Sequence, residues 1–248
     1  IIVMLIENND DEICGVATIV VRPGKVAGED TYVGYLGDLR VKFDRRIAVW
    51  WRRFYDEFLL NARNIEEFHH CRYYITSIMD ENKAAIKALV KNDRNAYSYL
   101  PFCQYNMVNI MLKNKLSPRH LSNSKYEIRF ANNNDLEALK IFYKKENENR
   151  PFGFQISDSH DEIDYRLKNW ESLNIEDYVL CLNRNGEIKG MTALWSHSPA
   201  KKIIINSMPK FEKVLFKTLS LFTNMPKESE EFKALYLTHL YLDEELTL

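Results

Sequence analysis

Several features that would assign a function directly are absent from this chain of 248 residues. No apolar run approaches the roughly 20 residues that a membrane-spanning helix requires. The 34 lysines and arginines nearly balance the 35 aspartates and glutamates, so net charge does not attract nucleic acid or an anionic membrane. No P-loop, GxSxG or HExxH pattern occurs. The sequence therefore predicts neither a nucleic-acid partner nor a membrane partner.

Cysteine and histidine are few, and neither is spaced as metal ligands are. The four cysteines include no CxxC pair, which argues against a zinc site, and we expect no metal cofactor. Each cysteine lies within or beside an apolar segment, which predicts buried, reduced thiols and a cytoplasmic protein. Cys71 follows His69 and His70, so a catalytic thiol is an alternative reading, although Cys71 begins a predicted strand.

The pattern that is present near the N-terminus alternates strands with helices. A strand is predicted over residues 32–41, an amphipathic helix over 43–63, a second strand over 71–79 and a helix over 81–91. Asp44 is the expected N-cap of the first helix. The buried stripe of that helix is predicted from apolar residues spaced three and four apart: Ile47, Trp50, Trp51, Phe54, Phe58 and Leu59.

Two adjacent tryptophans in this stripe cannot both point fully into a core. Successive helical residues are rotated by about 100° about the helix axis, so either Trp50 or Trp51 should turn partly outward. Arg45, Arg46, Arg52 and Arg53 lie on the opposite face, where they either bind phosphates or form an ordinary solvated surface.

A second unit follows a linker predicted at residues 116–125. It opens with an alternating strand at 126–131, and its Asn185-Gly186 pair is the strongest hairpin signal in the chain. The hairpin at 178–195 corresponds to residues 1–21, because each has a glycine early in its second strand. Likewise, residues 236–242 correspond to 34–41, which indicates an internal repeat.

The run from Gly34 to Val41, followed by Arg46, Asn82 and Ala85, resembles the core of the GNAT superfamily of acyl-CoA-dependent N-acyltransferases. The resemblance covers most of residues 1–112 and, more loosely, 126–196 and 235–242. It implies an α/β fold of the α+β mixed-sheet type, with two GNAT-like units that are each a mixed, mostly antiparallel sheet flanked by helices. The implied domains are 1–115, without its opening strand and helices, and 126–248, without its distal half.

The resemblance also implies where acyl-CoA binds. In the family, the backbone of the strand matching Leu39, Arg40 and Val41 pairs with the pantetheine arm, and the start of the next helix holds the pyrophosphate. Arg45 and Arg46 stand at that helix start, and Asn82 matches an asparagine that supports the pantetheine. The chain departs from the family's Gln/Arg-x-x-Gly-x-Gly/Ala pattern at three positions, which here hold Ile47, Val49 and Trp51.

The implied catalytic residues are a base and an acid. Asp38 is the candidate base that takes a proton from the acceptor amine directly or through water, although an ion pair with Arg40 is the alternative reading. The family's acidic tyrosine has no counterpart here, because residues 88–90 are Ala-Leu-Val. Tyr97 and Tyr99 lie just beyond and are the candidate substitutes. His239, in the equivalent strand of the second unit, reads as a hydrogen-bonded core histidine.

Two functions remain open from the sequence. The first is an N-acyltransferase that transfers an acyl group, specifically acetyl from acetyl-CoA, to an unidentified amine acceptor. The alternative is a non-catalytic GNAT-fold module that binds a ligand or regulates a partner. The missing glycines and the missing tyrosine favour the alternative, whereas the wide variation of the acid and base among family members favours the enzyme.

Overall fold

The computed structural model describes residues 1–8, 10–42, 44–90, 99–106, 108, 125–148, 150–154, 162–196, 198, 201–204, 206–207, 209–219, 231, 234–243 and 246. The chain divides into two compact units. The first comprises residues 1–106 with 150–159, and the second comprises 107–149 with 160–248. The domain boundaries expected from the sequence, 1–115 and 126–248, stay a prediction.

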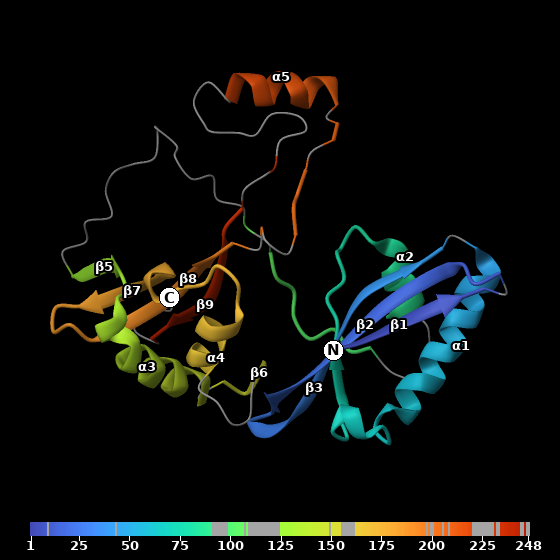
Figure 1. The fold of residues 1–248 in the computed structure, drawn as a ribbon, viewed down its shortest axis with the longest axis horizontal. Helices are drawn as coiled ribbons and strands as arrows, with labels where there is room; N and C mark the ends of the chain where they lie inside the picture. The colour runs from blue at the N-terminus through green and yellow to red at the C-terminus, as the bar shows by residue number, and fades with distance from the viewer. Residues whose placement is uncertain are drawn as a thin grey trace. The chain divides into compact units, whose positions relative to one another are not determined.

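The first unit is built on a five-stranded mixed sheet (Figure 1). Strands β1 (Ile2–Glu7), β2 (Ile13–Val26) and β3 (Glu29–Val41) form an antiparallel meander. The short strand β4 (Tyr73–Ile75) pairs parallel with β3. Strand β6 (Phe152–Phe154) pairs with the far end of β2, so a segment distant in sequence completes this sheet.

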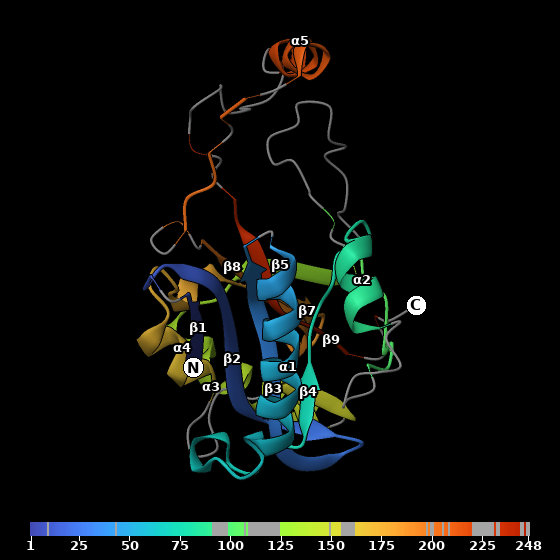
Figure 2. The ribbon, with the colours of Figure 1, turned by 90° about the vertical axis from the view of Figure 1, so that its right-hand side faces the viewer.

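Helix α1 (Arg45–Ala62) covers one face of this sheet, and Figure 2 shows it in front of β2 and β3. Asp44 is its N-cap, as the sequence predicts, because the carboxylate accepts a hydrogen bond from the Arg46 backbone N–H at 2.7 Å. Its buried residues are Trp51, Tyr55, Leu59 and Ala62. They pack against apolar side chains of β1 to β3: Met4, Ile6, Ala17, Ile19 and Leu36.

Two short helices complete the described part of the first unit. The 3-10 helix η1 (Glu66–Phe68) follows α1 and buries Phe68 in the same core. Helix α2 (Lys83–Leu89) follows β4, and the Asn82 side chain caps it by accepting a hydrogen bond from the Ala85 N–H at 3.1 Å.

The second unit is built on a four-stranded sheet of β5 (Tyr126–Phe130), β7 (Tyr178–Asn183), β8 (Ile188–Trp195) and β9 (Tyr236–Leu242). All its described pairings are antiparallel. Helices α3 (Leu136–Glu148) and α4 (Glu162–Asn169) supply Leu139, Phe142, Tyr143 and Ile163 to its core. The remaining elements are η2 (Asn133–Asp135), η3 (Ile175–Asp177) and α5 (Lys210–Leu219). The chain thus has the α/β class that the sequence predicts.

The two sheets repeat one pattern of strand pairing. In the first unit, Gly15 pairs with both Ile6 and Val41, and in the second Gly190 pairs with both Cys181 and Leu242. Both hairpins shift register one pair beyond this glycine. In each third strand, a bulge then lies between the second and third pairs from the glycine. Two irregularities at equivalent places agree with the correspondence seen in the sequence.

Candidate functional site

Strand β3 extends beyond the end of its parallel partner β4, which leaves the edge of β3 open at the C-terminal end of β3. The β3–β4 pairing ends at Tyr35 opposite Ile75, while β3 continues to Val41. Two side-chain contacts join the residues just after β4 to β3. The Thr76 hydroxyl donates to the Leu36 carbonyl at 2.9 Å, and the Ser77 and Tyr35 hydroxyls lie 2.8 Å apart. Beyond this point, the described residues show no strand paired with that edge of β3. Backbone donors and acceptors there are available to an extended ligand.

Asp38 lies at the bulge in this free part of β3. Its backbone has φ of 51°, the left-handed region that non-glycine residues rarely adopt, and the register shift places it opposite β2 between Val16 and Thr18. The Thr18 hydroxyl donates to the Asp38 carboxylate at 3.2 Å. Within the described part of the chain, no ion pair joins Asp38 to Arg40. Asp38 is exposed to solvent.

The N-terminus of α1 is already occupied by a carboxylate. Asp44 accepts from the Arg46 N–H, and this hydrogen bond holds the pKa of the Asp44 carboxyl below its usual value. A phosphate bound to the same backbone donors would compete with Asp44 and meet its negative charge. Arginine side chains near this helix start can hold a phosphate without displacing Asp44.

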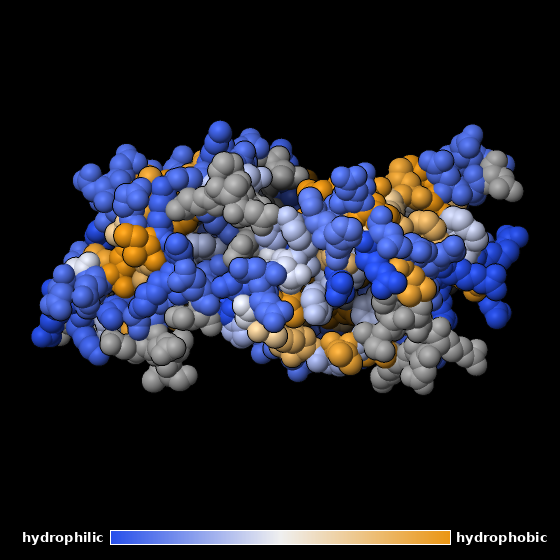
Figure 3. Space-filling model, turned by 90° about the horizontal axis from the view of Figure 1, so that it is seen from below, coloured by the Kyte–Doolittle hydropathy of each residue, from blue (hydrophilic) through white to orange (hydrophobic). Residues whose placement is uncertain are grey.

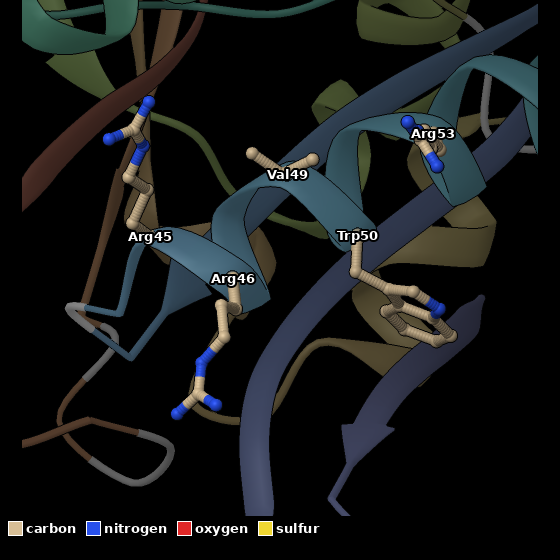
Figure 4. Close-up of a pocket in the computed structure, with 5 residues that line it drawn as sticks. All are labelled: Arg45, Arg46, Val49, Trp50 and Arg53. Carbon is tan, nitrogen blue, oxygen red and sulfur yellow. The ribbon is translucent and has the colours of Figure 1, made fainter.

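Three arginines supply such side chains around a pocket of about 340 Å³ on the outer surface of α1. Figure 4 shows its lining residues, all projecting from the first turns of the helix: Arg45, Arg46, Val49, Trp50 and Arg53. The Arg46 side chain is 93% exposed and its guanidinium lies 3.7 Å from the Asp44 carboxylate. The pocket combines cations with an indole face, a combination suited to phosphate and to an aromatic base.

The two adjacent tryptophans differ in burial, as helical geometry requires. Trp51 is buried, 5% exposed, and its ring lies 5.6 Å from that of Tyr55. Trp50 is 55% exposed, so its placement in the buried stripe is wrong; its ring stacks on Phe54 at 5.9 Å. Ile47 also packs against the core. Of the bulky residues at the family's small positions, only Val49 therefore lines the pocket.

The other predicted site residues are distributed as follows. Leu39 and Arg40 are exposed, and Val41 packs partly against the core. The Asn82 side chain caps α2. Tyr99 lies beside Tyr55 and Asp56 of α1, and burial raises the pKa of its phenol. Tyr97 lies outside the described residues.

Sequence reasoning did not single out two residues of this region, Thr18 and Ser77, and it did not decide which of Trp50 and Trp51 turns outward. Thr18 holds the Asp38 carboxylate, Ser77 contacts Tyr35, and Trp50 lines the pocket. The rotation between adjacent helical residues was the available signal for Trp50. The other two contacts join residues 20 and 42 positions apart and carry no local signal.

His239 occupies the equivalent bulge of the second unit, with φ of 54°. Its ring contacts Tyr143, Trp170 and Tyr178, and its Nδ1 lies 2.7 Å from the Thr238 hydroxyl. Burial lowers the pKa of His239 to about 3. Among described side chains, its Nε2 atom is buried without a hydrogen-bond partner. The core histidine expected from the sequence is thus hydrogen-bonded through one nitrogen.

Two further observations concern metal and membrane. The described residues contain no group of three or more His, Cys, Asp or Glu side chains that could hold a metal ion. No described helix is both long enough and apolar enough to cross a bilayer.

Comparisons with known proteins were made by sequence and by structure. No family model and no curated protein matches the sequence. A crystal structure of Saccharomyces cerevisiae N-myristoyltransferase with bound myristoyl-CoA is similar at 9% identity and a TM-score of 0.46, over 97% of this chain and 50% of that chain. A second such structure is similar at 9% identity and a TM-score of 0.44, over 96% of this chain and 52% of that chain. A third, which also holds inhibitors, is similar at 9% identity and a TM-score of 0.45, over 97% of this chain and 51% of that chain. The chain spans about half the length of these enzymes, and a likeness at this level does not establish its function.

Proposed function

We propose that the protein is an N-acyltransferase that transfers an acyl group, acetyl in the simplest case, from acyl-CoA to an amine. The observation that carries the proposal is the order of three features along β3 and into α1. A parallel pair of strands separates at Tyr35, a bulge with an exposed carboxylate follows at Asp38, and an arginine-rich helix begins at Arg45. This order matches the arrangement that the GNAT resemblance implies.

The proposed binding of acyl-CoA differs from the family arrangement in how the phosphates are held. The free edge of β3 at Leu39, Arg40 and Val41 offers backbone groups to the amides of the pantetheine. Arg45 and Arg46 are the proposed phosphate ligands and act through their guanidinium groups, because Asp44 already accepts from the Arg46 N–H. We also assign an adenine-stacking role to the Trp50 indole.

The proposed chemistry is direct transfer between two bound substrates. The amine nitrogen attacks the thioester carbonyl, the C–N bond forms, and the C–S bond breaks to release CoA as a thiolate. Asp38, or a water beside it, takes the proton from the attacking nitrogen. Backbone N–H groups of residues 39–41 are the proposed oxyanion donors. Tyr99 is the proposed acid that protonates the thiolate, although burial raises the pKa of its phenol and makes it a weaker proton donor than an exposed tyrosine.

A non-catalytic ligand-binding module is the second candidate, and one observation favours it. The Asp44 carboxylate places a negative charge at the helix start, which opposes a pyrophosphate there. A regulatory module that binds CoA weakly, or binds another anion, would retain the arginines without needing Asp38. We propose a cytoplasmic location for either candidate.

Calorimetric titration of residues 1–248 with free CoA, acetyl-CoA and myristoyl-CoA tests the proposal. The three ligands separate binding of the nucleotide end from preference for acyl length. Arg46→Ala should weaken CoA binding roughly tenfold to a hundredfold, as expected for one charged hydrogen bond to phosphate. Arg52→Ala is the matched control, because Arg52 is exposed on the same helix but lies outside the pocket.

The outcomes separate the candidates. Binding that falls in Arg46→Ala but not in Arg52→Ala supports the phosphate site, and an equal response refutes it. Free thiol released only when an amine is added, and lost in Asp38→Asn, supports transfer. Saturable binding without amine-dependent release across peptide and small amines supports the non-catalytic module. The absence of binding at millimolar ligand overturns the acyl-CoA site itself.

A further inference from the structure

The pocket on α1 carries one more cation than the proposed ligands of the pyrophosphate. Arg45 and Arg46 line the end of the pocket at the start of the helix. A third arginine, Arg53, lines the same pocket about one turn beyond Trp50. The assignment of Arg45 and Arg46 to the pyrophosphate and of Trp50 to the adenine leaves Arg53 without a role.

The spacing along α1 places Arg53 at the opposite end of the pocket from Arg46. Seven residues separate the two arginines, which is about two helical turns and a rise of about 10 Å. Trp50 lies four residues after Arg46 and three before Arg53, so the three side chains share one stripe of the helix. Figure 4 shows Trp50 between these two arginines along the helix. The exposed indole therefore has a cation on each side.

The Arg53 side chain is available to a ligand. It is exposed, and within the described part of the chain no ion pair or hydrogen bond involves it. Glu57, the acidic residue one turn further along, is not paired with it there. By contrast, the Arg46 guanidinium already lies 3.7 Å from the Asp44 carboxylate. The planar set of donors on Arg53 is thus free to bind a phosphate through two hydrogen bonds.

Exposed apolar side chains alone would not indicate a ligand here. Figure 3 shows hydrophobic residues reaching one face of the molecule among hydrophilic ones. The pocket differs from a merely apolar patch because arginines flank Val49 and Trp50 along the helix. This arrangement favours a ligand in which an aromatic base lies between two anionic groups. The nucleotide end of CoA has this form, since its ribose carries the pyrophosphate at the 5′ position and a separate phosphate at the 3′ position.

We propose that Arg53 binds the 3′-phosphate of CoA and thereby selects CoA-bound acyl groups over donors that lack this phosphate. The inference rests on the proposed function, which places the nucleotide end of CoA in the pocket. With the pyrophosphate at Arg46 and the adenine on Trp50, the 3′-phosphate is the remaining anion for Arg53. An acyl group carried by phosphopantetheine on a carrier protein has neither the adenine nor the 3′-phosphate, so it lacks both of these contacts.

Calorimetric titration of residues 1–248 with CoA and with dephospho-CoA tests the proposal, because the two ligands differ only in the 3′-phosphate. The parent chain should bind CoA roughly tenfold to a hundredfold more tightly, as expected for one charged hydrogen-bonded contact. Arg53→Ala should reduce the affinity for CoA to that for dephospho-CoA and leave the affinity for dephospho-CoA unchanged. Arg46→Ala should weaken both ligands by the same factor, since both contain the pyrophosphate.

Arg52→Ala controls for long-range attraction of the more highly charged ligand. Arg52 is exposed beside Arg53 in sequence but lies outside the pocket, so its removal should not change the ratio of the two affinities. The cycle formed by Arg53→Ala and the loss of the 3′-phosphate isolates their direct interaction. An equal change of this ratio in Arg52→Ala and Arg53→Ala would reduce the effect to general electrostatics and overturn the proposal.

The remaining outcomes distinguish this proposal from the proposed function. Equal binding of CoA and dephospho-CoA by the parent chain overturns the role of Arg53 and leaves the acyl-CoA site standing. A loss of affinity for both ligands in Arg53→Ala also overturns it, because Arg53 would then contact a group that the ligands share. Selective binding of CoA without amine-dependent release of thiol supports the 3′-phosphate contact and counts against transfer. Binding of neither ligand at millimolar concentration overturns both.

Discussion

Trp50 and Trp51 are adjacent and identical in type, but one is exposed and the other is buried. We therefore expect their alanine variants to differ strongly in the free energy of unfolding. Trp51 is buried against Tyr55 and Phe54, at ring distances of 5.6 and 5.7 Å. Truncating a buried aromatic side chain costs about 3–5 kcal/mol. Trp51→Ala should therefore remove a large share of the stability of the first unit, since a whole domain is stable by only about 5–15 kcal/mol.

Trp50→Ala should cost far less. Its indole is more than half exposed and its described ring contact is the stack on Phe54. Such an aromatic pair contributes about 0.5–1.5 kcal/mol, so the expected loss is about 1 kcal/mol. The same variant should weaken CoA binding, because Trp50 lines the pocket and Trp51 does not.

Urea unfolding followed by far-ultraviolet circular dichroism measures both variants, with hydrogen exchange of β2 amides to distinguish the first unit from the second. Calorimetric titration with CoA measures the second property. Equal losses of stability in Trp50→Ala and Trp51→Ala would refute the assigned orientation of α1. Unchanged CoA affinity in Trp50→Ala would show that the pocket does not bind the nucleotide end.

Three further predictions follow from individual contacts. Asp44→Asn, which retains the helix cap but removes the charge, should bind CoA more tightly in the titration than the parent chain; weaker or equal binding would contradict competition between Asp44 and phosphate. The pKa of His239 is lowered to about 3 in the folded protein, so as the pH falls this histidine takes up a proton in the unfolded chain before it does so in the folded one. The stability of the second unit should therefore fall as the pH decreases from about 6.5 toward 3. Urea unfolding at several pH values should show this fall, and His239→Asn, which tolerates the left-handed backbone, should flatten it. Gly24→Ala should cost about 1–3 kcal/mol in urea unfolding, because its Cβ would lie 2.5 Å from the Gly153 carbonyl oxygen of β6.

Much of the local structure could be predicted from residue patterns. The helix from Arg45 and its Asp44 cap follow from apolar spacing and a carboxylate before the first turn. The hairpin at Asn185-Gly186 follows from turn chemistry, and Gly186 has φ of 80°. The equivalence of 1–21 with 178–195 was readable from one glycine in each hairpin. These features depend on neighbours within a few residues, which is why the sequence suffices for them.

The candidate site was predictable only in outline. The position of Asp38 on β3 and of Arg46 at a helix start follow from the sequence, but the bulge that turns Asp38 toward Thr18 depends on pairing between β2 and β3. A one-residue shift in that pairing would reverse every side chain beyond it. The assignment of Trp50 to the core failed for a related reason, since the facing sheet selects which part of an apolar helix surface is buried.

By itself, the sequence determined the class of the fold and the main helix and hairpin signals, because these rest on short-range periodicity and backbone preferences. Only the tertiary structure decided that β6 joins the first sheet and that β3 separates from β4 after Tyr35. It also decided which face of each sheet is covered. All three depend on contacts between segments that are distant in the sequence, and residue type and local spacing do not specify such contacts.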